Sequence, residues 1–92
     1  MSQIEQYFDA ENWSKFSLNF KSKENDPKFI ELVSELENDI ELANVIYEGF
    51  ESESLKWINE KIPALDNLTP KECLINSNLK NRLKECLMRM PR

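Results

Sequence analysis

The chain has 92 residues, of which 40% are hydrophobic, 10% aromatic and 32% charged, and its formal net charge is −5. A chain of this length holds one small hydrophobic core, so we expect a single soluble domain over residues 1–92. The sequence has no histidine and only two cysteines, so it lacks both the imidazole base of most catalytic triads and the four Cys or His ligands of a usual structural zinc site.

The composition predicts an all-α fold, a small bundle of four to five helices. The sequence contains one glycine, and Leu, Glu, Lys and Asn dominate over scattered β-branched residues. Residues 1–45 form an N-terminal helical segment of unclear role. Within it, Trp13, Phe16 and Phe20 have helical spacing, although Phe16, Leu18 and Phe20 also alternate with polar residues as in a strand. We favour a helix there because a lone strand would have no partner.

A clear helix signal begins at Asp26, which can cap the free N–H groups of a helix that starts at Pro27. The apolar residues that follow recur on one helical face, and they include Phe29, Leu32, Val33, Leu36, Ile40, Ala43, Ile46, Tyr47 and Phe50. The pattern fits either one long helix to about Glu48 or two helices broken near residues 38–39. Gly49 is the expected C-terminal stop.

Residues 52–59 predict a short helix, and residues 61–68 predict a connector that contains Pro63. Thr69, Pro70 and Glu72 then form the pattern of a capping box, in which Thr69 and Glu72 satisfy each other's backbone N–H groups. The last apolar stripe indicates a helix that Pro91 stops, and its members are Leu79, Leu83, Cys86, Leu87 and Met90.

The location predicted from the sequence is cytoplasmic. The N-terminus lacks the basic and apolar regions of a signal peptide, and no apolar run exceeds three residues, so we expect no membrane span. Cys73 and Cys86 lie within apolar helical patterns. We expect them to be buried as small hydrophobic residues rather than joined in a disulfide.

Charge is divided along the chain. Residues 29–55 hold eight acidic side chains and no lysine or arginine, whereas residues 71–92 hold six basic and two acidic side chains. A solvated helix face is the ordinary explanation of either run, and a binding surface is the alternative.

Neither enzyme activity nor DNA binding is expected. The single glycine excludes a glycine-rich phosphate loop, and we predict no catalytic, cofactor-binding or metal-binding residues and no cofactor. Residues 40–59 have the spacing of a helix-turn-helix, but Glu53 and Glu60 offset Lys56 and Lys61 on its second helix. A DNA-binding regulator is therefore a minority alternative.

The most specific pattern lies between residues 55 and 74 and consists of Trp57, Pro63, Leu65, Thr69, Pro70, Glu72 and Leu74. It resembles the toxin-binding domain of the MbcA/ParS/Xre family of bacterial antitoxins, and the matching region is about residues 46–92. The chain departs from that family in lacking a convincing helix-turn-helix before this region. Asn67 also stands where the family has a connector glycine, and residues 76–78 lack a second one. Each matching residue has a structural alternative, with Trp57 as a core side chain and Thr69 and Glu72 as caps.

The resemblance implies a protein partner, a RES-type toxin that degrades NAD and whose substrate entrance the antitoxin's C-terminal helix covers. Arg82 and Arg89 are seven residues apart and share a helix face, which suits acidic or phosphate-binding groups on a partner. The partner-binding candidates are Arg82, Met88, Arg89, Met90, Pro91 and Arg92. The alternatives are that Leu87 and Met90 are core and the arginines solvated, and that the chain is a helical adaptor without a toxin. A homodimer is a further possibility, because a domain this small can leave one apolar face uncovered.

Overall fold

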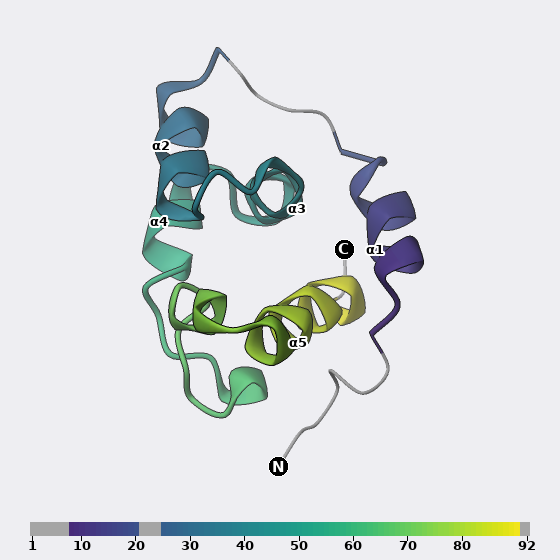
Figure 1. The fold of residues 1–92 in the computed structure, drawn as a ribbon. Helices are drawn as coiled ribbons and strands as arrows, with labels where there is room; N and C mark the ends of the chain where they lie inside the picture. The colour runs from purple at the N-terminus through teal and green to yellow at the C-terminus, as the bar shows by residue number, and fades with distance from the viewer. Residues whose placement is uncertain (1–7, 21–24, 91–92) are drawn as a thin grey trace.

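The computed structural model describes residues 8–20 and 25–90, which form α-helices and short 3-10 helices around one core (Figure 1). This confirms the predicted all-α class. The α-helices are α1 (Ala10–Ser17), α2 (Pro27–Glu35), α3 (Ile40–Phe50), α4 (Ser54–Trp57) and α5 (Ser77–Arg89). The 3-10 helices are η2 (Glu51–Glu53), η3 (Pro63–Leu65) and η4 (Glu72–Ile75).

Side-chain caps explain where four of these helices begin. Asp9, Asp26, Asp39 and Asn76 each accept a backbone N–H of the first turn, at 2.9 to 3.0 Å. Such caps stabilise a helix by about 1 kcal/mol each, because they satisfy a donor that has no partner within the helix.

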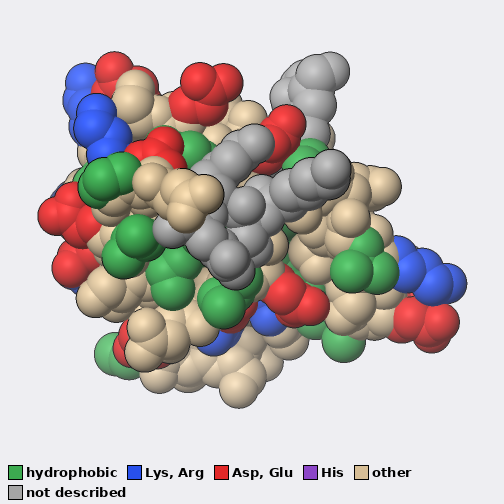
Figure 2. Space-filling model, turned by 90° about the horizontal axis from the view of Figure 1, so that it is seen from above, with side chains coloured by type: hydrophobic (Ala, Val, Ile, Leu, Met, Phe, Trp, Pro, Cys, Tyr) green, Lys and Arg blue, Asp and Glu red, His purple; other side chains and the backbone are tan. Residues whose placement is uncertain are grey.

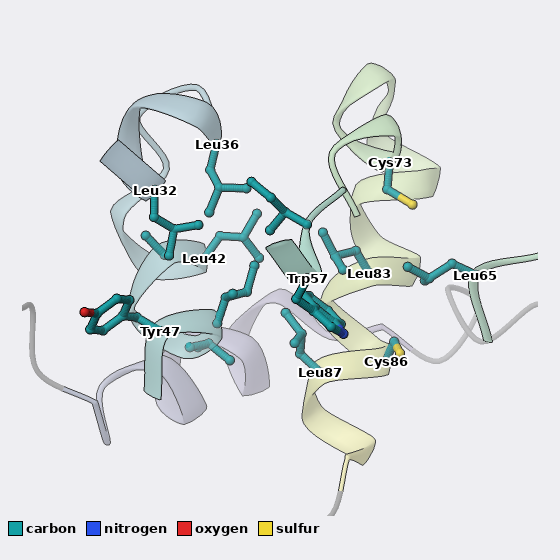
Figure 3. Close-up of a cluster of buried hydrophobic side chains, with 14 of the residues drawn as sticks. Leu32, Leu36, Leu42, Tyr47, Trp57, Leu65, Cys73, Leu83, Cys86 and Leu87 are labelled. Carbon is teal, nitrogen blue, oxygen red and sulfur yellow. The ribbon is translucent and has the colours of Figure 1, made fainter. Parts of the chain in front are cut away.

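Helix α3 lies at the centre of the fold, and α1, α2, α4 and α5 all contact it (Figure 1). Five of its residues are buried, namely Leu42, Ala43, Val45, Ile46 and Tyr47. In Figure 3, Trp57 lies between the leucines of α2 and α3 on one side and those of α5 on the other. Burial of apolar area in this one cluster is the main stabilising contribution to the fold.

The apolar stripe of residues 29–50 is divided between two helices, so the second of the two predicted arrangements is confirmed. The break occurs at Glu37 and Asn38, whose φ angles of 58° and 64° lie in the left-handed region. Asp39 then caps α3. The turn changes the direction of the chain and allows Leu36 and Leu42 to enter the same core.

The prediction that Gly49 stops the helix is wrong. Helix α3 continues through Gly49 to Phe50, and the left-handed residue is Glu51, with φ 46° and ψ −122°. The physical reason is a tertiary contact. The ring of Phe50 stacks on Trp57 with centroids 4.3 Å apart. This contact favours a helix that includes Phe50, and the chain turns at the next residue.

The remaining local predictions hold with altered bounds. The short helix expected over residues 52–59 is reduced to α4, which follows the 3-10 turn η2. Residues 10–17 are helical as favoured, but Phe20 lies beyond the end of α1 and packs against Phe16. Helix α5 ends at Arg89, and the expected stop at Pro91 lies outside the described residues.

Cys73 and Cys86 are both buried and free, as predicted. Burial raises the pKa of the Cys73 thiol to about 11 and also raises that of Cys86, because a thiolate is poorly solvated in an apolar core. Both side chains therefore act as small apolar groups.

Candidate protein-binding surface

The residues that carry the antitoxin resemblance form the support on which α5 lies. Trp57 is only 8% exposed and Leu65 is buried in the same core, which matches their structural interpretation. Pro63 starts η3, Pro70 is fully buried, and Leu74 packs partly against the core. Both η3 and η4 contact α5.

The predicted capping box is present. The Thr69 N–H donates to Glu72 Oε1 at 2.8 Å, and the Glu72 N–H donates to Thr69 Oγ1 at 3.0 Å. The bond from the Thr69 N–H is the main cause that lowers the pKa of Glu72. The box opens the 3-10 helix η4 rather than an α-helix, so it fixes a tight turn just before α5.

The connector before this box contains a left-handed turn. Asp66 and Asn67 have φ angles of 56° and 65°, and the Ile62 N–H donates to the Leu68 carbonyl across the turn at 3.0 Å. Asn and Asp enter this region more easily than other residues with a side chain. Asn67 therefore adopts the left-handed conformation at the position where the resemblance implies glycine.

The two arginines of the predicted partner-binding row have partners within the protein. Arg82 Nη1 lies 2.6 Å from Asp66 Oδ2, with the two side chains 13% and 27% exposed. Arg89 Nε lies 2.7 Å from Glu85 Oε2, but its side chain is 51% exposed. Arg82 therefore joins α5 to the connector, and Arg89 is the more accessible of the two.

The other candidates at the end of α5 are less exposed than the sequence suggested. Met88 and Met90 are partly buried and pack against the core, and for Met90 this agrees with the structural alternative. Pro91 and Arg92 lie outside the described residues.

The acidic and basic runs of the sequence form ion pairs with each other in the folded chain. Lys71 of the basic run pairs with Glu35, and Lys80 Nζ lies 3.1 Å from Asp39 Oδ2. Lys84 lies over the rings of Phe8 and Trp13, at 5.8 and 5.5 Å from their centroids. Much of the positive charge of residues 71–92 is thus engaged by this chain's own residues.

The acidic run is only partly neutralised by these contacts. Within residues 8–20 and 25–90, no ion pair involves Glu37, Glu48, Glu51 or Glu53, all of which are exposed. Figure 2 shows acidic side chains spread over one face, with hydrophobic side chains between them. The accessible charge of the described surface is therefore mainly negative.

One hollow in the surface is acidic. It has a volume of about 390 Å³ and is lined by Asp26, Tyr47, Glu48, Glu51 and Ser52. The Tyr47 hydroxyl donates to the Asp26 carboxylate, which also caps α2. This bond is the main cause that lowers the pKa of Asp26 and raises that of Tyr47 to about 12, so at neutral pH the pair is a phenol bonded to a carboxylate.

In the wild type, the Tyr47 hydroxyl contributes stability that is lost at alkaline pH. We expect the Tyr47→Phe variant to lack this contribution at every pH. The folded pKa of Tyr47, about 12, exceeds its ordinary value of 10.0, so the contribution of its hydroxyl is complete below pH 10.0 and is lost as the pH rises toward 12. Urea unfolding midpoints across this window should fall more steeply in the wild type than in the variant. Parallel pH profiles would contradict the assignment.

A second hollow lies at the start of α5, and we refer to it as the Ile75 groove. Its volume is about 420 Å³, and it is lined by Glu37, Leu68, Lys71, Glu72, Leu74, Ile75 and Leu79. Ile75 itself is 80% exposed. No binding groove at this position was predicted from the sequence. The available signal was Ile75, an apolar residue outside both helical stripes and followed directly by polar residues 76–78.

Metal and membrane sites receive no support from the residues described. Among them, no group of three or more His, Cys, Asp or Glu side chains is placed to hold a metal ion. None of the helices in this part of the chain has the length and apolar character needed to cross a membrane.

Comparison of the chain with protein-family models, curated proteins and solved structures finds no match.

Proposed function

We propose that this chain is an antitoxin-like cytoplasmic protein that binds a RES-type NAD-degrading toxin and inhibits it sterically, with the C-terminal helix over the substrate entrance. It performs no catalysis of its own in this proposal. The observation that supports it is the arrangement of the resembling residues around α5. Trp57, Leu65 and the Thr69–Glu72 box together form a rigid base for that helix.

Arg89 is the residue of the described α5 best placed to contact such a toxin. Its guanidinium is half exposed in the last turn, whereas Arg82 is mostly buried against Asp66. An exposed guanidinium can form two parallel hydrogen bonds with a carboxylate or phosphate of a partner.

Co-expression with a RES-domain toxin tests this function. The wild type should restore growth and cellular NAD. Arg89→Gln and removal of residues 91–92 should each weaken rescue. Lys15→Gln is the control, because Lys15 also belongs to an i,i+4 ion pair on a helix, and it should rescue fully. Truncation before α5 is unsuitable, since it would remove the buried Leu83, Cys86 and Leu87.

The second candidate is a helical adaptor that binds a protein other than a toxin. The Ile75 groove favours it, because that surface lies at the other end of α5 from Arg89. Failure of the wild type to rescue growth from the co-expressed RES-domain toxin would remove the antitoxin proposal and leave this candidate. DNA binding is not favoured, because α4 has four residues and would extend only about 6 Å along a groove.

A further inference from the structure

We propose that the Ile75 groove is a docking site for a segment of a partner protein that carries an apolar side chain next to a lysine or arginine. This inference goes beyond the proposed function and does not depend on it. The groove is formed at the start of α5, whereas the proposed toxin contact is at the end of that helix.

The apolar part of the groove is both accessible and held in place. Leu68, Leu74 and Leu79 pack partly against the core and present their remaining surface to the groove. Ile75 is 80% exposed at the end of η4. The capping box precedes η4, and the Asn76 side chain accepts the Leu79 N–H at 2.9 Å directly after it. A partner thus meets a preformed apolar surface and orders little of the chain on binding.

The charges at the edge of the groove select the partner. Lys71 is its one cation, and its ammonium is already bonded to Glu35. Glu72 uses its carboxylate in the capping box, which lowers its pKa and keeps it ionised. Glu37 is exposed and, within the residues described, has no ion pair.

The uncompensated charge at the groove is therefore negative. A basic side chain on the partner would complement Glu37 and Glu72, whereas an acidic one would be repelled. The same negative charge disfavours a second copy of this chain as the occupant, because the net charge of each copy is −5.

A phage library of random 12-residue peptides, selected against the full chain, tests the proposal without a known partner. We expect enriched peptides that share an apolar residue next to Lys or Arg. Ile75→Asp should weaken their binding about tenfold or more, because it removes the apolar side chain that a bound peptide covers and puts a charged group in its place. Leu18→Asp should leave binding within about twofold, because Leu18 is equally exposed, at 81%, and does not line the groove.

Charge reversal provides the second arm. Glu37→Arg should shift the selected peptides from basic to acidic residues, whereas Glu53→Arg, an exposed glutamate outside the groove, should not. Circular dichroism of each variant establishes that it is folded. The proposal is overturned if no peptides are enriched, or if binding survives Ile75→Asp. It is also overturned if sedimentation shows a wild-type dimer that Ile75→Asp converts to a monomer, which would identify a second copy as the occupant.

Discussion

Trp57→Ala should destabilise the protein by about 3–5 kcal/mol, the usual cost of removing a large buried aromatic side chain. Small domains have a free energy of unfolding of about 5–15 kcal/mol, so this loss is a large fraction of the total. The urea concentration at the midpoint of unfolding should fall accordingly. The physical reason is the position of Trp57 in the core, where its ring stacks on Phe50 at an interplanar angle of 18°. Urea unfolding followed by far-ultraviolet circular dichroism measures the change.

Two further variants make this result specific. Trp57→Phe retains a ring next to Phe50 and should cost clearly less than Trp57→Ala. Leu18→Ala alters an exposed side chain and should change stability by no more than about 0.5 kcal/mol. If Trp57→Ala left stability unchanged but abolished partner binding, Trp57 would be a binding platform and its assignment to the core would be wrong.

The second large effect is expected at the ion pair between Arg82 and Asp66. Arg82→Met should destabilise the protein by about 1–3 kcal/mol, because the Asp66 carboxylate then loses the cation with which it pairs. The value should be below that of a fully buried pair, since Asp66 is partly solvated. Asp66→Asn keeps the shape of the side chain and its tolerance of the left-handed region.

A double-mutant cycle of these two substitutions separates the pair from the other contacts of Arg82. We expect a coupling energy of about 1 kcal/mol or more. The cycle of Lys15→Gln and Glu11→Gln is the control, because that pair is 71% and 76% exposed and should give about 0.5 kcal/mol or less. A coupling near zero for Arg82 and Asp66 would show that this ion pair contributes little to the stability of the fold.

Local features of the fold could be predicted from the sequence because they depend on neighbouring residues. The cap at Asp26 and the reciprocal bonds of Thr69 and Glu72 arise within three residues. The end of α3 could not be predicted in this way. It depends on Phe50 meeting Trp57, and no local rule locates that contact.

The candidate surface was predicted less well for a related reason. Helical spacing correctly places Arg82 and Arg89 on one helix, but it does not reveal which groups of other elements face them. The pairing of Lys71 with Glu35 joins residues 36 positions apart. Because such contacts pair the basic side chains with acidic ones, the accessible charge is mainly negative, although the sequence pattern suggested a basic surface.

The position of α3 limits how the proposed toxin-binding region could be transplanted. The region of resemblance begins at about residue 46, which falls within α3 (Ile40–Phe50). Leu42 and Val45 are buried on one side of that point, and Ile46 and Tyr47 on the other. A chimaera joined at residue 46 would replace half of the central helix and inherit a mismatched core. Exchange of this region with another protein would therefore have to include the whole of α3 and its cap, Asp39.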